Sequence, residues 1–173
     1  YFYKSQKKSI SLPNIIGQIS KNLIINFPWK RSMRWGEGNL RWVRPLKFVY
    51  CSLFNHDNSF EIIDLKLNEV KSVNFTFGHY LMSSKTIYPK SVSDYLKKLF
   101  ENKVILDSDE RKKIIIDASK NLLKNKNSSL LFDEDLIEEI VGLVEWPVVF
   151  LGQIDKEFLF LPKEILRVTM KEH

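Results

Sequence analysis

A chain of 173 residues, 44% hydrophobic and 28% charged, is long enough for one domain with a sizeable core and is not composed like a disordered protein. No apolar run approaches the ~20 residues that cross a bilayer, so we expect no membrane partner, and the single Cys51 excludes an internal disulfide. The formal charge is +6, but residues 1–50 carry ten Lys or Arg against one acid, which favours a polyanionic partner.

Helical and extended patterns follow one another in the first half of the chain. Ser11 as N-cap and Pro13 in the first turn predict a helix, which an apolar stripe continues until Pro28 ends it. Gly36 and Gly38 mark a turn between two short extended pieces. Short loops then join three predicted strands, which indicates an antiparallel meander. The three strands are expected at residues 43–54, 60–67 and 70–77.

After these strands the pattern becomes helical. Apolar residues at helical spacing predict three amphipathic helices, and Asp107 with Glu110 forms a capping-box-like start to the second. Pro147 ends the third helix, and Pro162 begins a last one. The three helices are expected at residues 92–100, 107–122 and 136–144, and further short strands at 148–151 and 158–161.

Strands grouped first and helices grouped later indicate a single α+β domain over residues 1–173, with one antiparallel sheet packed against the helices.

The stretch KRSMRWGEGNLRWVRP, residues 30–45, holds four of the six arginines and two of the four tryptophans. We expect both tryptophans to pack inward, because large aromatic side chains dominate core energetics. Lys30, Arg31 and Arg41 are predicted to face outward and bind nucleic-acid phosphates, since a guanidinium can contact a phosphate bidentately. The structural members of the stretch, whose arginines would hydrogen-bond carbonyls or a carboxylate, are expected to be Arg34, Trp35, Arg44 and Pro45.

No catalytic or cofactor pattern stands out along the chain. There is no glycine-rich phosphate loop, no HExxH and no His–Cys cluster with metal spacing, so we expect no catalytic residue, metal or cofactor here. Gly78 and His79 are interpreted as turn residues, with Gly78 free to adopt positive φ. A free cysteine suits a reducing, cytoplasmic setting. The other residues assigned a structural role are Glu145, Trp146 and Pro147.

Several stretches together resemble the beta subunit of the bacterial heterotetrameric glycyl-tRNA synthetase. They occur in the family's order and at about its spacing, over essentially the whole chain. Family beta subunits are several times longer, and the chain begins without Met, so it is expected to be an N-terminal region of one. The matching stretches are LPNIIGQISKNL (12–23), MRWGEGNLRWVRPLKF (33–48), FGHYL (77–81), DERKKII (109–115), LVEWPVVFLG (143–152), FLFLPKEIL (158–166) and MKEH (170–173).

The resemblance implies a non-catalytic part of a glycine–tRNA ligase. In the family the alpha subunit uses ATP and glycine, within a tetramer of two alpha and two beta subunits, and the beta subunit supports binding and charging of tRNA(Gly). The chain alone is therefore expected to have no ligase activity. The resemblance also implies a fold similar to the editing-type domain of the phenylalanyl-tRNA synthetase beta subunit.

Two functions remain open from the sequence. A tRNA-binding and assembly domain needs only a basic face, which the first 50 residues supply. A hydrolytic proofreading domain acting on mischarged tRNA needs a positioned base, for which His79 and nearby hydroxyls are the candidates. The family usually has Arg after the Gly-His pair, whereas this chain has Tyr80, so a positive site at that turn is not expected here.

Overall fold

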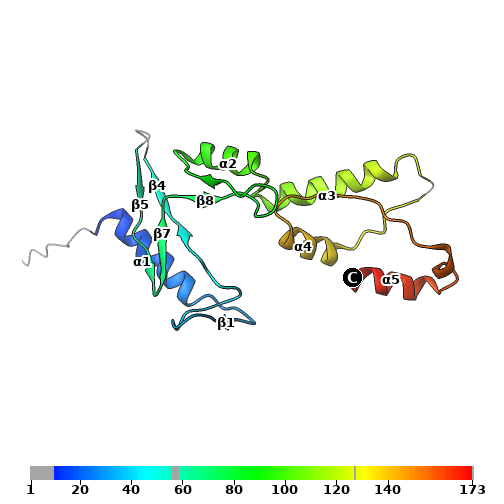
Figure 1. Cartoon of the computed structure of the whole chain (residues 1–173), viewed down its shortest axis with the longest axis horizontal. Helices are drawn as coiled ribbons and strands as arrows, with labels where there is room; N and C mark the ends of the chain where they lie inside the picture. The colour runs from blue at the N-terminus through cyan, green and yellow to red at the C-terminus, as the bar shows by residue number, and fades with distance from the viewer. Residues whose placement is uncertain (1–9, 56–58, 127, 173) are drawn as a thin grey trace, which may run out of the picture. The chain divides into compact units, whose positions relative to one another are not determined.

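The computed structural model describes residues 10–55, 59–126 and 128–172, which form an α+β fold of helices and small sheets (Figure 1). The chain divides into two compact units, Tyr1–Lys98 (the first unit) and Leu99–His173 (the second unit). The single domain expected over residues 1–173 stays a prediction. The helices are α1 (Leu12–Ile25), α2 (Val92–Glu101), α3 (Ser108–Leu123), α4 (Glu134–Leu143), the short 3-10 helix η1 (Lys156–Phe158) and α5 (Lys163–Glu172).

The predicted helices are confirmed, with bounds that differ by only a few residues. Ser11 occupies the N-cap position of α1, where its carbonyl accepts a hydrogen bond from the Ile15 amide at 3.1 Å, although its side chain caps nothing. Asp107 caps α3 as predicted, because its Oδ1 accepts from the amides of Asp109 at 2.8 Å and Glu110 at 3.3 Å.

The strands are shorter and more scattered than predicted. Residues 43–48 form no strand. The prediction of a single antiparallel sheet is wrong, because the described strands form four small sheets. The hairpin of β8 and β9 was not predicted. The strands are β1 (Met33–Arg34), β2 (Arg41–Trp42), β3 (Val49–Tyr50), β4 (Ser52–Phe54), β5 (Phe60–Ile62), β6 (Lys66–Leu67), β7 (Val70–Val73), β8 (Thr76–Phe77) and β9 (Thr86–Ile87).

One strand pair runs parallel, against the expected meander. β4 pairs with β5 and β6 with β7, both antiparallel, so the chain reverses twice between β3 and β7. After two reversals β7 runs in the direction of β3, and the two pair in parallel with Val49 opposite Ser72. The sheet order β3-β7-β6 follows from this path.

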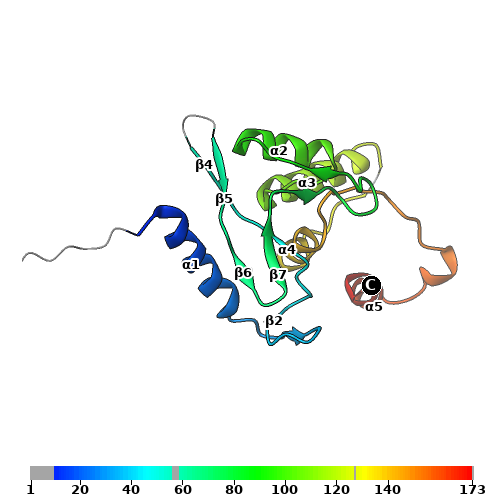
Figure 2. The same ribbon diagram turned by 60° about the vertical axis from the view of Figure 1, so that its left-hand side comes forward.

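The core of the first unit lies between α1 and the β6–β7 hairpin. Gly17 in α1 is buried, and a Cβ atom at this position would lie 3.3 Å from Ile63 Cγ2. Figures 1 and 2 both show α1 running beside these strands. The buried side chains here are Leu65, Leu67 and Val70, with the partly buried Ile24, Trp35, Leu40, Leu46 and Val49 packed against them.

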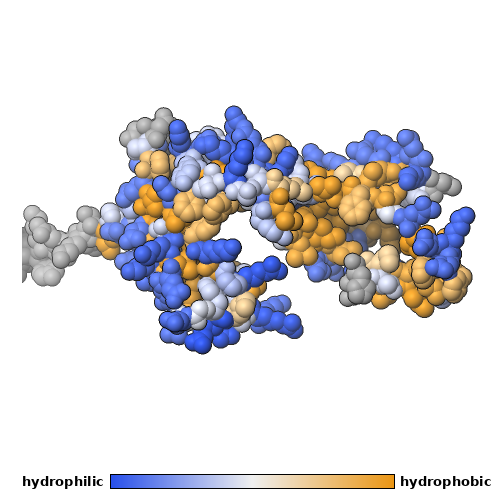
Figure 3. Space-filling model, in the orientation of Figure 1, coloured by the Kyte–Doolittle hydropathy of each residue, from blue (hydrophilic) through white to orange (hydrophobic). Residues whose placement is uncertain are grey.

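In the second unit α3 packs beside α4, and buried Ile115 and Val141 come from the two helices. The strands predicted at residues 148–151 and 158–161 are wrong. Val148, Val149 and Phe150 pair with no described strand; they line a hollow together with side chains of α3 and α4, and Val148 and Phe150 are exposed. Figure 3 shows apolar side chains gathered over α4 and α5.

Candidate nucleic-acid interface

The arginine–tryptophan stretch folds into a two-stranded ribbon of β1 and β2. Gly36 turns the chain with φ of +59°, a conformation that costs glycine little. The strands pair with Met33 opposite Trp42 and Arg34 opposite Arg41. Since directly opposed residues share one face of a sheet, the ribbon has an arginine face and an apolar face.

The apolar face of the ribbon packs on the segment that follows α1. Trp42 lies in edge contact with Trp29, with ring centroids 4.9 Å apart, and 5.5 Å from the ring of Phe27. Trp35, just beyond β1, packs against the buried cluster around Leu65. Both tryptophans of the stretch are thus half-buried in aromatic or apolar surroundings.

The arginine face is exposed. Arg41 is held in place by its own ribbon, since its Nε donates to Ser32 Oγ at 3.3 Å and its Nη2 to the Ser32 carbonyl at 3.1 Å. Opposite it, Arg34 forms no hydrogen bond or ion pair with another described residue. Two like charges thus face each other across one strand pair, an arrangement that destabilises a bare ribbon and that a bound anion would relieve.

The remaining predicted residues of the stretch surround this ribbon. Lys30 and Arg31 lie just before β1, and both are exposed. Arg44 and Pro45 follow β2 and are exposed as well, and within the described part of the chain Arg44 has no hydrogen bond or ion pair. The bracing contacts that the structure does describe belong to Arg41, while a bracing role for Arg34 and Arg44 stays a prediction.

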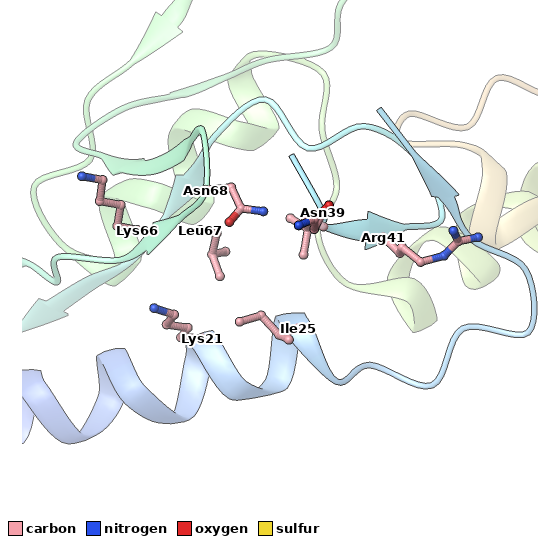
Figure 4. A pocket seen from close by; sticks show the side chains of 8 residues that line it. Lys21, Ile25, Asn39, Arg41, Lys66, Leu67 and Asn68 are labelled. Atoms are coloured by element: carbon pink, nitrogen blue, oxygen red, sulfur yellow. The ribbon is translucent and has the colours of Figure 1, made fainter. Parts of the chain in front are cut away.

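Beside the ribbon lies a hollow of about 370 Å³ between the end of α1, β2 and the β6–β7 turn (Figure 4). Lys21 and Lys66 extend to the same side of it, and Arg41 extends to the opposite side. Between these cationic ends lie two carboxamides and an apolar lining. These lining side chains are Asn39, Asn68, Ile25, Leu40 and Leu67.

Sequence reasoning missed Lys21 and Lys66 as partners of the arginine stretch. Lys21 reads as a polar position on an amphipathic helix, and Lys66 as a solvent-facing strand residue. The only local signal is Asn68, a turn-forming residue that follows Leu67 and precedes Glu69, and it adopts a φ of 53° in the structure. The packing of α1 on the β6–β7 hairpin brings the two lysines together.

His79 forms part of a tight turn between β8 and β9. Its Nδ1 accepts from the amides of Leu81 at 3.3 Å and Met82 at 3.2 Å, and its carbonyl accepts from Ser83 N at 2.8 Å. The Gly78 amide donates to the Lys85 carbonyl at 3.4 Å and closes the turn, but the positive φ expected for Gly78 is wrong, since among the described residues the glycine with positive φ is Gly36. One imidazole nitrogen is therefore engaged by the backbone, which fits a turn-forming role.

Glu145, Trp146 and Pro147 follow α4 in the second unit. The carbonyl of Glu145 accepts from the Ile105 amide at 2.9 Å, while its side chain is exposed. Trp146 meets Phe100 edge-on, with ring centroids 5.2 Å apart, and Lys103 Nζ lies 4.5 Å from its ring centroid. These contacts anchor the chain after α4.

Within the described residues the structure shows neither a metal-binding cluster nor a membrane-spanning helix. No group of three or more His, Cys, Asp or Glu there could hold a metal ion. No helix in the part of the chain that the structure describes is long and apolar enough to cross a membrane.

The fold is that of an α+β protein. Its β1–β2 ribbon and the neighbouring hollow form a positively charged surface that suits a polyanion. The chain matches the family model described as glycyl-tRNA synthetase beta subunit over residues 1–173, and it belongs to that family. It is 40% identical over its whole length to the glycine–tRNA ligase beta subunit of Ruegeria sp. (strain TM1040), covering 25% of that protein.

Two further relatives carry the same name. The glycine–tRNA ligase beta subunit of Paracoccus denitrificans is 39% identical over 92% of the chain and 23% of its own length. That of Cereibacter sphaeroides (strain ATCC 17029) is 36% identical over 97% of the chain and 24% of its own length. The chain thus spans about a quarter of the length of the curated relatives it matches.

Proposed function

We propose that this chain is a non-catalytic, tRNA-contacting part of a glycine–tRNA ligase beta subunit, which supports tRNA binding and assembly of the complex that charges tRNA(Gly). The observation that carries the proposal is the arginine face of the β1–β2 ribbon, where Arg34 and Arg41 lie directly opposite each other. The names of the relatives indicate tRNA as the polyanion, because a glycine–tRNA ligase acts on tRNA.

An RNA backbone fits this face for electrostatic reasons. A phosphate between opposed guanidinium groups replaces a repulsion by two attractions, and arginine keeps its charge at any physiological pH. Lys30 and Arg31 lie just before the ribbon and extend the positive surface along the chain. Phosphate contacts of this kind release counterions, so the affinity should fall steeply as salt rises.

The test compares the full-length beta subunit in its complex with a triple variant, Lys30→Gln, Arg31→Gln and Arg41→Gln. We expect weaker tRNA binding and a log–log salt dependence whose slope is shallower by about two to three, since each of the three lost phosphate contacts contributes roughly 0.7–0.9. The control carries the same charge change on exposed lysines of the second unit, Lys113→Gln, Lys120→Gln and Lys124→Gln. Equal affinities for the two variants would mean that the arginine face meets protein or solvent.

The alternative proposal, hydrolytic proofreading of mischarged tRNA, is less favoured. A pocket for glycine, the smallest amino acid, can reject larger ones sterically, and His79 Nδ1 is engaged by backbone amides. We expect no deacylation of mischarged tRNA that depends on this residue. Deacylation that survives in His79→Asn, which keeps an acceptor for the turn, would exclude imidazole catalysis. A rate lost in both His79→Asn and His79→Ala, with the fold intact, would favour proofreading.

The remaining expectations belong to the same proposal. ATP and glycine would be used by an alpha subunit, in a cytoplasmic tetramer of two alpha and two beta subunits. The likeness to the editing-type domain of the phenylalanyl-tRNA synthetase beta subunit concerns the fold, and a fold by itself does not imply its activity. The chain alone should catalyse no ATP–pyrophosphate exchange, which is measurable with the purified fragment.

A further inference from the structure

We infer that the hollow between α1, β2 and the β6–β7 turn binds one unpaired nucleotide, with its base against the apolar lining and its flanking phosphates at the two cationic ends. This inference rests on the proposed function, because it takes the nucleotide to be part of an RNA strand. It adds a place, a ligand chemistry and a set of residues that the arginine face alone does not define.

The size and lining of the hollow suit a nucleotide. Its volume of about 370 Å³ falls within the roughly 300–1,000 Å³ of pockets that hold small organic ligands. Ile25 is 49% exposed and Leu40 is half-buried, so these two side chains, next to the buried Leu67, present an apolar surface without a charged group. A flat base can cover such a surface and remove it from water.

Two carboxamides, those of Asn39 and Asn68, line the hollow and can supply partners for the edge of a base. An amide side chain offers a donor and an acceptor together, which matches the paired donors and acceptors on base edges. Asn68 occupies a backbone position with a φ of 53°, which asparagine tolerates better than most residues. That conformation explains an asparagine at this turn, whereas Asn39 has ordinary backbone geometry and no such requirement.

The charges are placed at the ends of the hollow. Lys21 and Lys66 are both exposed and extend to one side, while the Arg41 guanidinium stands at the other side, fixed by Ser32 (Figure 4). A nucleotide within an RNA strand has a phosphate on each side, so the two phosphates of one nucleotide can contact both cationic ends of the hollow. The arrangement therefore fits a segment of strand better than it fits an isolated anion.

The hollow also continues past the two lysines. Lys21 and Lys66 line a second depression of about 410 Å³ along α1, together with Asn14, Gln18 and Asp64. Asp64 brings one carboxylate, so this depression is less positive than the first. Because the two depressions share Lys21 and Lys66 in their linings, an RNA strand can pass from the hollow into the second depression without a sharp reversal.

An unpaired nucleotide is favoured over a duplex for a geometric reason. The bases of a duplex are stacked and paired, and they cannot reach a lining recessed between a helix and a hairpin. Recognition of RNA by base contacts accordingly targets unpaired nucleotides whose bases can turn out of a stack. The exposed arginine face of the neighbouring ribbon has no such restriction and can follow a paired backbone.

The test uses the full-length protein in its complex and three binding probes: a short single-stranded oligoribonucleotide, the same strand annealed to its complement, and adenosine monophosphate. We expect Lys21→Gln with Lys66→Gln to weaken binding of the single strand roughly tenfold, since two charge-assisted contacts are lost. Binding of the duplex should weaken much less. The matched control is Lys113→Gln with Lys120→Gln, which makes the same charge change on exposed residues of α3.

A second pair of variants tests the carboxamides. Asn39→Asp with Asn68→Asp keeps the side-chain shape, and aspartate also tolerates positive φ, so the fold should persist. The two new charges should repel the flanking phosphates and remove the preference for the single strand. The control with equal charge change is Asn121→Asp with Asn125→Asp, both exposed in the second unit.

The outcomes separate this inference from the proposed function. If the Lys30, Arg31 and Arg41 triple variant loses tRNA affinity while the Lys21 and Lys66 variant behaves like its control, the hollow is not a nucleotide site and the RNA-contacting role stands. If neither variant loses affinity, both proposals fail. Equal losses of affinity for the single strand and the duplex would contradict the inference that the bound nucleotide is unpaired.

Adenosine monophosphate is the third probe. If it binds in a way that depends on Lys21 and Lys66 while the single strand does not bind, the nucleotide in the hollow does not come from RNA.

Discussion

Arg111 of α3 reaches the carbonyl of Val141 in α4, with Nε donating at 3.1 Å across thirty residues of sequence. Its Nη1 also donates to the carbonyls of Ile105 at 2.6 Å and Leu106 at 2.9 Å. One half-buried guanidinium thus donates to three backbone carbonyls that accept no hydrogen bond within a helix or a sheet. The stretch before α3, the end of α4 and α3 itself are held together at this residue.

Replacing Arg111 should therefore destabilise the protein strongly. We expect Arg111→Ala to lower the free energy of unfolding by about 2–3 kcal/mol, because each partly buried carbonyl left without a donor has a desolvation cost. Lysine should not rescue the loss, since its single ammonium group cannot reproduce the fork of donors. Denaturant unfolding checks this, with exposed Lys113→Ala as the control expected to stay within about 0.5 kcal/mol. A loss no larger than that of the control would contradict the bracing role.

Two glycines in helices should respond to alanine with opposite signs. At Gly17 in α1 a Cβ would lie 3.3 Å from Ile63 Cγ2 and 3.4 Å from the Asp64 carbonyl, so Gly17→Ala should push α1 off the strands and destabilise the first unit. At Gly142 in α4 a Cβ would meet nothing within 4 Å. Gly142→Ala should stabilise the protein by about 0.5–1 kcal/mol through helix propensity. Thermal unfolding of both variants measures the two effects, and a shift of the same sign would refute the close packing of α1.

The ion pair of Asp133 with Lys171 should make the attachment of α5 sensitive to acid. Asp133 Oδ2 accepts from Lys171 Nζ at 2.7 Å, and Oδ1 accepts from the Leu136 amide at 3.1 Å. The Lys171 contact first and then the amide hold the pKa of Asp133 below its ordinary value of 3.8. A lowered pKa means that the stabilisation is present above pH 3.8 and is lost as the pH falls through the folded pKa.

The matched variant for this pair is Asp133→Asn. Asparagine is a good N-cap and keeps the bond to the Leu136 amide, but it removes the charge that pairs with Lys171. Urea unfolding across the acidic range should show a flatter pH dependence for this variant than for the wild type. Asp117→Asn, an exposed site on α3, should leave the dependence unchanged. Identical pH profiles for wild type and Asp133→Asn would show that the pair contributes nothing.

Arg34→Glu separates stability of the ribbon from binding of RNA. The substitution turns two opposed positive charges into an opposite-charge pair with Arg41, so the ribbon should keep or slightly gain stability, by about 0.2–1 kcal/mol. The affinity of the full complex for tRNA should fall, and by more than in the charge-matched control Lys113→Glu. Filter binding and thermal unfolding give the two readouts. A marked loss of stability would instead support the bracing role expected for Arg34 from the sequence.

Helix positions and their starts could be read from the sequence because the physics is local. The apolar spacing of α3 and the carboxylate of Asp107 act within one or two turns of the same helix. The inward packing of tryptophans also follows from residue type. Strand pairing was less predictable, because strands of two to four residues carry too short an alternation to define a partner.

Other features depend on residues that are distant in sequence. The parallel pairing of β3 with β7 results from two chain reversals, and neither strand carries a local mark of it. The same holds for Arg111, whose role depends on where the end of α4 comes to lie. A charged residue looks alike in sequence whether it is solvated or bound to carbonyls, since only the fold supplies the partner.

The sequence by itself determined the family, the helices, the excess of positive charge in the first 50 residues and the clustering of arginine with tryptophan. Only the tertiary structure decided which charges share a surface. The register of the ribbon places Arg34 opposite Arg41, and the packing of α1 on the β6–β7 hairpin brings Lys21 beside Lys66. Composition records how many charges a chain has, whereas the field at a binding surface depends on their distances, which the fold sets.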